Sequence, residues 1–172
     1  MRELQRRRVV NITARNMLGL FHGLDDSRGG AGPQQLRVVS VLDLTEDVLH
    51  QSGIRRGSRV LDLGCGVGDV SLWIAKLVGP TGLVVGVDES AEVIDAAERR
   101  ATVTDRCYWT RFITADLNTF TSHERFDGVV VRPKLVLHPE HATFSQLSAF
   151  IHPGGVIMIL AGRPAGSKEA VV

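Results

Sequence analysis

The chain has 172 residues, with 20 Lys and Arg against 19 Asp and Glu, so its formal net charge at pH 7 is only +1. This balance excludes a protein that binds polyanions through overall positive charge. With 44% hydrophobic residues and 18 glycines, the chain has enough apolar side chains for one core, and its length favours a single domain. Its two cysteines, Cys65 and Cys107, match neither a metal motif nor a disulfide framework, which predicts free thiols in a reducing cytoplasm.

The first 35 residues differ in composition from the rest. Several arginines surround scattered apolar residues, and a stretch rich in Gly, Asp and Pro follows. No run approaches the roughly 18 apolar residues that cross a bilayer, and the Arg-rich start lacks the apolar stretch of a secretory signal. We therefore predict a soluble cytoplasmic protein without a membrane partner, consisting of an N-terminal segment (1–35) and one domain (36–172).

Apolar patterning predicts the elements of that domain. A helix over 36–52 is indicated by five apolar residues on one helical stripe: Val38, Val41, Leu42, Val48 and Leu49. Strands follow over 58–63, 83–88, 110–115, 126–131 and 156–160, with helices over 67–78, after a capping Ser90, and over 142–151. This alternation predicts a doubly wound, mostly parallel Rossmann-like α/β sheet with helices on both faces. Such a sheet binds its ligand at the carboxyl ends of its strands.

The loop after the first of these strands carries the strongest functional signal. In the run DLGCGVGD (62–69), three glycines crowd one turn between a strand and a helix. Glycines there allow a ligand to lie directly on the main chain at a helix N-terminus. The even spacing of Gly64, Gly66 and Gly68 disfavours a dinucleotide, and Asp62 would repel a pyrophosphate. A ligand with positive charge, such as a sulfonium or ammonium group, fits better.

The run VLDLGCGVG (60–68) resembles the first motif of the class I S-adenosylmethionine-dependent methyltransferases. The resemblance covers about residues 36–160 and is greatest to the small-molecule enzymes related to the ubiquinone and menaquinone C-methyltransferases. It implies S-adenosylmethionine as cofactor and methyl transfer to an O-, C- or N-nucleophile of a small molecule. It also implies no metal, and an alternative is a cofactor-binding but inactive scaffold or partner subunit.

The resemblance assigns the cofactor's methionine part and ribose to the loop residues Gly64, Cys65 and Gly66, with Asp62 as the acid beside them. Asp88, which ends the second predicted strand, corresponds to the family's ribose-binding acid, and Glu89 follows it. The chemistry of Asp88 supports this assignment independently, since an ionised carboxylate offers two acceptor oxygens to a vicinal diol.

The adenine site is implied to lie after the third predicted strand, where Asp116 corresponds to the acid that accepts from the adenine amino group. Ala115 and Leu117 flank the base in this interpretation. Arg132 follows the fourth predicted strand and is expected at the mouth of the site, in contact with cofactor or substrate. His138 and His141 are the nearest candidates for a general base, but we assign no catalytic residue.

Two departures from the family limit the interpretation. Arg132-Pro133-Lys134-Leu135 stands where nucleobase methyltransferases carry an aromatic clamp, so we expect no nucleic-acid partner. Only twelve residues follow Leu160, too few for the family's last helix and antiparallel strand pair. The last predicted strand would then have an uncovered edge. A truncation, a homodimer that covers this edge, and a reduced fold that uses its N-terminal segment as cover all remain open.

Overall fold

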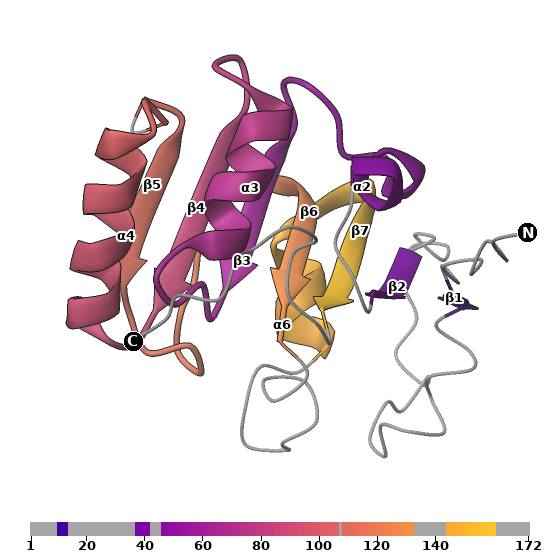
Figure 1. The fold of residues 1–172 in the computed structure, drawn as a ribbon. Helices are drawn as coiled ribbons and strands as arrows, with labels where there is room; N and C mark the ends of the chain where they lie inside the picture. The colour runs from indigo at the N-terminus through magenta and orange to yellow at the C-terminus, as the bar shows by residue number, and fades with distance from the viewer. Residues whose placement is uncertain (1–9, 14–36, 42–45, 107, 133–143, 161–172) are drawn as a thin grey trace, which may run out of the picture.

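The computed structural model describes residues 10–13, 37–41, 46–106, 108–132 and 144–160 (Figure 1). In chain order the elements are β1 (Val10–Thr13), β2 (Arg37–Val41), α2 (Glu46–Ser52), β3 (Arg59–Leu63), α3 (Asp69–Val78), β4 (Leu83–Asp88), α4 (Ala91–Val103), β5 (Thr110–Thr114), β6 (Phe126–Val131), α6 (Phe144–Ala149) and β7 (Ile151–Leu160). They form one sheet with strand order β1-β2-β7-β6-β3-β4-β5. Every pair is parallel except β1 with β2.

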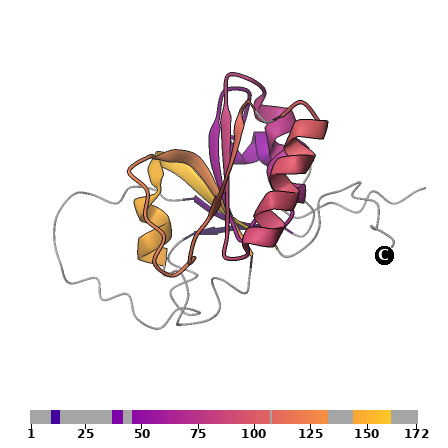
Figure 2. The same cartoon turned by 90° about the vertical axis from the view of Figure 1, so that its left-hand side faces the viewer.

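Helices cover both faces of this sheet, as the doubly wound prediction requires. Figure 2 shows the sheet between α3 and α4 on one side and α6 on the other. On the first face, side chains of α2 and α3 pack on alternate residues of β3, β4, β6 and β7. Leu147 of α6 packs on the opposite face with the intervening residues of the same strands. The central strands are therefore apolar on both sides, which explains their continuous runs of hydrophobic residues.

Glycines and a capping serine mark the ends of the two helices beside β4. Gly68 in the left-handed conformation precedes α3, and Gly79, with φ +65°, ends it. Ser90 caps α4, because its side chain accepts from the main-chain N–H of Val93. The predicted cap is thus confirmed. Gly82 allows the chain to pass close to Val78 and the Ser58 carbonyl, where a Cβ would lie 2.7 Å from both.

The predicted helix over 36–52 is wrong in its first half. Residues Arg37–Val41 form β2, and the helix α2 begins only at Glu46. Val38, Val39 and Val41 are β-branched, which favours an extended chain. The parallel pairing with β7 then decides between the two conformations. The helical spacing of these valines was coincidental, because a run this short is compatible with either period.

The edge of β7 is also not uncovered, contrary to the expectation from the sequence. β2 pairs with it from Arg37 opposite Val156 to Val41 opposite Leu160, and β1 lies outside β2. The covering strand β2 belongs to the predicted domain (36–172), and β1 (Val10–Thr13), which pairs with β2, belongs to the predicted N-terminal segment (1–35). The sheet consequently contains two strands more than the five that were predicted.

The predicted Pro-Gly-Gly turn lies inside β7, whose start is five residues earlier than expected. Between Phe126 and Gly128 of β6 the register with β7 shifts from Ile151 to Val156. Gly154 has φ +84°, a conformation in which glycine is favoured. The irregularity is a bulge at the amino-terminal edge of the sheet.

Candidate functional site

The site lies at the carboxyl ends of β3, β4 and β6. β3 is flanked by β4 on one side and by β6 on the other, so the chain order reverses beside β3. In an open parallel sheet, the crevice at such a reversal is where ligands bind. All the predicted site residues follow or end strands β3 to β6, and the parallel pairing brings these strand ends to one edge.

The glycine loop connects β3 to α3 in a conformation that depends on its glycines. Gly64, Gly66 and Gly68 have φ of +72°, +54° and +79°. The main-chain N–H groups of Gly64 and Cys65 both donate to the carbonyl of Val87, at 2.8 and 3.0 Å, which fastens the loop to β4. A Cβ on Gly66 would have no atom of the described residues within 4 Å, whereas one on Gly68 would approach Ala97 and Phe112 at 3.1 Å. Gly68 is thus required by packing, and Gly66 borders open space.

Asp88 links the end of β4 to this loop. Its Oδ2 accepts from the main-chain N–H of Gly66 at 2.8 Å, and its Oδ1 accepts from the N–H of Ser90 at 3.1 Å. The side chain is half-buried. An ionised carboxylate has about four lone-pair positions in total, so each oxygen keeps room for another donor. Asp88 is therefore oriented by the main chain and still able to accept from a ligand.

The end of β5 approaches the same place. The N–H of Ala115 donates to the carbonyl of Asp88 at 3.0 Å, and the N–H of Leu117 donates to Glu89 Oε1 at 3.4 Å. Asp116 is exposed, and its Oδ1 accepts from the N–H of Asn118 at 2.8 Å. Hydrogen bonds thus join four of the predicted residues around the ends of two adjacent strands: Asp88, Glu89, Ala115 and Leu117.

Asp62 lies beneath the loop rather than on its surface. Its side chain is fully buried, and Oδ2 accepts from Ser71 Oγ of α3 at 2.6 Å. Within the described part of the chain, Oδ1 has no hydrogen-bond partner. Burial raises the pKa of Asp62 above its ordinary value, while the positive charge of Arg132 opposes this shift. A buried carboxylate oxygen without a donor is costly, and it is a group that a cationic ligand could satisfy.

Cys65 contributes only main chain to the open side of the loop. Its side chain is buried with Leu72, Ile94 and Phe112 between the sheet and the helices. Burial raises the pKa of its thiol, and the charge of Asp62 adds to the shift. The thiol is therefore protonated and is part of the core.

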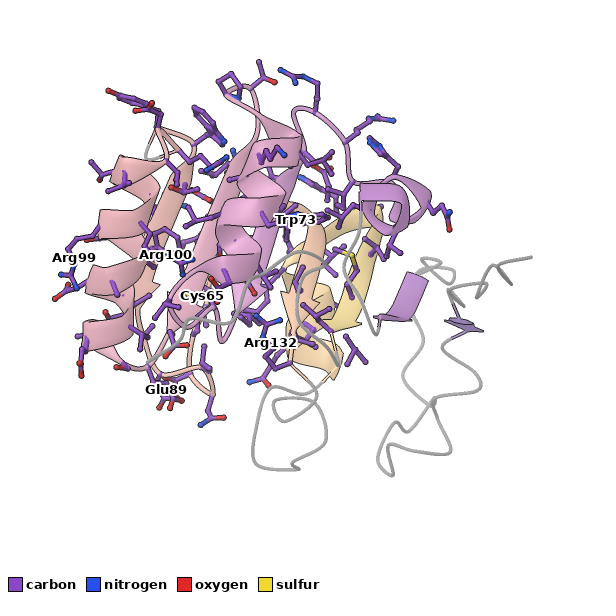
Figure 3. All side chains as sticks on the ribbon, in the orientation of Figure 1. Cys65, Trp73, Glu89, Arg99, Arg100 and Arg132 are labelled. Atoms are coloured by element: carbon purple, nitrogen blue, oxygen red, sulfur yellow. The ribbon has the colours of Figure 1, made fainter. Side chains whose placement is uncertain are left out.

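Arg132 is the first residue after β6, and it lies at the same end of the sheet as Cys65 (Figure 3). It is half-buried. Among the described residues it forms no ion pair, although its charge acts on Asp62. His138 and His141 lie outside the described residues. No cluster of three His, Cys, Asp or Glu side chains that could hold a metal ion occurs in the described ranges.

Sequence reasoning missed two polar residues that shape the site. Ser71 holds Asp62, and Arg100 of α4 binds the far side of the glycine loop through Val67 and Asp69. Ser71 lies nine positions after Asp62, on the first turn of α3, and an apolar-stripe analysis passes over it. Arg100 is exposed and looks like an ordinary solvated helix residue.

A family model described as a methyltransferase domain matches residues 60–155, which is more than half of the chain. The chain belongs to this family. The match begins in β3 and ends in β7, so it contains all the strand ends described above. The family expected from the glycine loop is confirmed.

Two curated relatives illustrate the similarity. The chain is 29% identical over 128 residues to a probable cobalt-precorrin-6B C(15)-methyltransferase (decarboxylating) of Thermoplasma acidophilum, covering 74% of this chain and 58% of the relative. It is 30% identical over 115 residues to a demethylmenaquinone methyltransferase of Staphylococcus saprophyticus, covering 66% of this chain and 48% of the relative. The chain thus spans about half the length of the curated relatives that it matches.

Solved structures agree on the fold. A SAM-dependent methyltransferase from Thiobacillus denitrificans, in complex with S-adenosyl-L-homocysteine, superimposes with a TM-score of 0.54 at 26% identity and covers 66% of this chain and 48% of that one. A methyltransferase from Geobacter sulfurreducens, in complex with the same ligand, gives a TM-score of 0.54 at 24% identity and covers 67% and 48%. The Rossmann-like fold class predicted from the sequence is therefore confirmed.

Proposed function

We propose that this chain binds S-adenosylmethionine and transfers its methyl group to a small-molecule acceptor. One observation supports the proposal most directly: Asp88 is fixed by the N–H of Gly66 at a point where the loop borders open space. A ligand that lies on the main chain at Gly66 would bring a sugar within reach of the Asp88 carboxylate. The Thiobacillus relative, at 26% identity, was solved with S-adenosyl-L-homocysteine, which has such a sugar.

The remaining predicted residues fit the other parts of this cofactor. Asp116, with Ala115 and Leu117, lies beyond Asp88 and would border the adenine, and Glu89 holds Leu117 there. Beneath the loop, Asp62 has a fully buried oxygen without a partner in the described part of the chain, and the negative charge of this carboxylate would attract the cofactor's ammonium group through the loop. The cation of Arg132 would then face the cofactor's carboxylate.

The cofactor supplies a sulfonium methyl group, which is already a strong electrophile. The protein's task would be to hold an acceptor in line with that group and to exclude water. Buried Asp62 and half-buried Asp88 put negative charge beside the cationic ligand, which favours the positively charged donor over the neutral product. We assign no proton transfer to a residue.

We place the reaction in cytoplasmic small-molecule biosynthesis. The curated relatives are named for cobalt-precorrin-6B and for demethylmenaquinone, which are small molecules. Cys65 is a buried free thiol, which is typical of proteins in reducing compartments. No helix in the described ranges is long and apolar enough to cross a membrane.

Methyl transfer can be tested with S-adenosylmethionine labelled in its methyl group, incubated with the protein and a panel of phenols, amines and quinone precursors. The proposal predicts label in at least one acceptor and release of S-adenosylhomocysteine. NADH serves as the comparison ligand, and tighter binding of NADH than of S-adenosylhomocysteine would contradict the proposal. Binding of S-adenosylhomocysteine without turnover on any acceptor would favour the inactive scaffold.

A further inference from the structure

Arg100, in the last turn of α4, reaches across to the loop between β3 and α3. One guanidinium nitrogen donates to the main-chain carbonyl of Val67 at 2.7 Å, and another donates to Asp69 Oδ1 at 2.5 Å. These two acceptors lie on either side of Gly68. A guanidinium is planar and presents its donors in a fixed fork, so it can fix two acceptors in one relative position.

The glycine loop needs such external restraints. Glycine loses more conformational freedom on folding than any other residue, and this loop has three glycines at positive φ. Gly68 precedes α3 without a side-chain cap, so no side chain of the loop itself fixes this end. On the flank of the loop next to β4, Val87 and Asp88 accept its N–H groups. On the flank next to α4, Arg100 binds the segment from Val67 to Asp69.

The geometry points to Arg100 as a positioning residue that holds the glycine loop in its ligand-binding conformation. The inference rests on the proposed function, because it concerns the affinity of the same loop for the same cofactor. A loop that is already ordered before the ligand arrives loses less conformational freedom on binding. Arg100 would thereby raise the affinity without touching the ligand.

The ion pair between Arg100 and Asp69 is exposed to solvent, which bears on whether Arg100 acts mainly on the stability of the domain or on the affinity of the loop. The side chains of Arg100 and Asp69 are 44% and 50% exposed. Ion pairs exposed to this extent contribute little to the stability of a whole domain. Loss of Arg100 should therefore lower the melting temperature by only a few degrees and leave the chain folded, so that the affinity of the loop for the ligand can still be measured.

Arg99 provides a matched control on the same helix. It is exposed, and its side chain forms no hydrogen bond or ion pair with any residue that the structure describes. Figure 3 shows Arg99 pointing away from α3 and Arg100 pointing toward it. Removing either side chain deletes one positive charge from the same turn, but only one of the two contacts the loop.

The experiment is calorimetric titration of the full chain with S-adenosylhomocysteine, for wild type, Arg100→Ala, Arg100→Lys, Arg99→Ala and Asp69→Asn, with melting temperatures measured in parallel. We expect Arg100→Ala to bind about fivefold more weakly, the change that corresponds to losing one exposed charged contact. Arg99→Ala should bind as wild type does. Arg100→Lys should lie between them, because an ammonium keeps the charge and loses the fork.

Asp69→Asn keeps Arg100 and its bond to Val67 while it removes the ion pair, so it tests the inference even if Arg100→Ala does not fold. It should weaken binding less than Arg100→Ala. Equal affinities of Arg100→Ala and Arg99→Ala, or an unchanged affinity in Asp69→Asn when Arg100→Ala is unfolded, would overturn the inference and leave the proposed function intact. If the wild type itself does not bind, the proposed function fails first.

Discussion

The two halves of the sheet differ in how far apart in the sequence their paired strands lie. Strands β3, β4 and β5 are consecutive, neighbouring and parallel, and the loops that follow them carry most of the site. On the other side, β2 pairs with β7, so that Arg37 lies opposite Val156. The half formed by β3, β4 and β5 is thus determined by residues close together in the sequence. The half that contains β2 and β7 depends on pairing between distant parts of the sequence. A candidate site can therefore be predicted from local sequence patterns even where the outer strands of the same sheet cannot.

Removing residues 1–41 should have the largest effect, because it deletes β1 and β2 and leaves the outer edge of β7 unpaired. An apolar parallel strand with free main-chain groups is a template for association with other chains. We expect the shortened chain to self-associate, and light scattering after size-exclusion chromatography measures this. Deletion of residues 1–9 alone is the control, since it keeps both strands. A monodisperse monomer after the longer deletion would show that β2 is dispensable and that the two halves differ less than we infer.

The role of the glycine loop in ligand binding can be tested separately with two alanine substitutions that should strain the backbone to a similar extent. Gly66→Ala and Gly154→Ala both place a Cβ at positive φ, where no atom of the described residues lies within 4 Å. Each should lower the free energy of unfolding by about 1 kcal/mol.

Only Gly66→Ala should also weaken binding of S-adenosylhomocysteine, by about tenfold or more, because its Cβ occupies the space where the ligand would lie on the main chain. Gly154 is at the opposite edge of the sheet, in the bulge of β7. Titration and thermal melting of both variants give the comparison. Equal affinities of the two variants would place the ligand somewhere other than above Gly66.

The sequence predicted strands β3 to β6 and the glycine loop well, because their signals are short-range. The buried run before Asp62, the glycines after it, and an acid at the end of the next strand each follow from a few neighbouring residues. The apolar stripe from Val38 to Leu49 led to the wrong prediction of a helix over 36–52. β-Branched residues at helical spacing also fit a strand when β7 is available as a partner. Ser71 and Arg100 could not be found, because a polar residue on a helix becomes informative only when its acceptor is located in space.

A smaller effect is expected from Asp62→Asn, which should raise the stability of the chain but weaken ligand binding. Burial raises its folded-state pKa above the ordinary 3.8, so the folded chain holds this proton more tightly than the unfolded chain. The contribution of Asp62 to the free energy of unfolding therefore falls as pH rises above about 3.8 and continues to fall up to the folded-state pKa.

Asp62→Asn should remove this loss and raise stability at pH 7, with a difference that shrinks as the pH is lowered. The same variant should bind S-adenosylhomocysteine more weakly, because a neutral amide attracts the ligand's ammonium less than a carboxylate does. Denaturant unfolding across pH measures the first effect and titration the second. Asp95→Asn, at an exposed position on α4, is the control. A variant less stable than wild type at pH 7 would contradict the inference that burial of this carboxylate costs stability.

The most direct measurement is a calorimetric titration of S-adenosylhomocysteine into wild type and Asp88→Asn, with melting curves to show that both are folded. Asn keeps one acceptor oxygen and replaces the other, which accepts from the main chain and would accept from the sugar, with an amide nitrogen. We predict saturable binding at one site per wild-type chain and a loss of affinity of at least tenfold in a folded Asp88→Asn. An absence of binding to wild type at millimolar ligand, or equal affinities in the two proteins, would contradict this prediction.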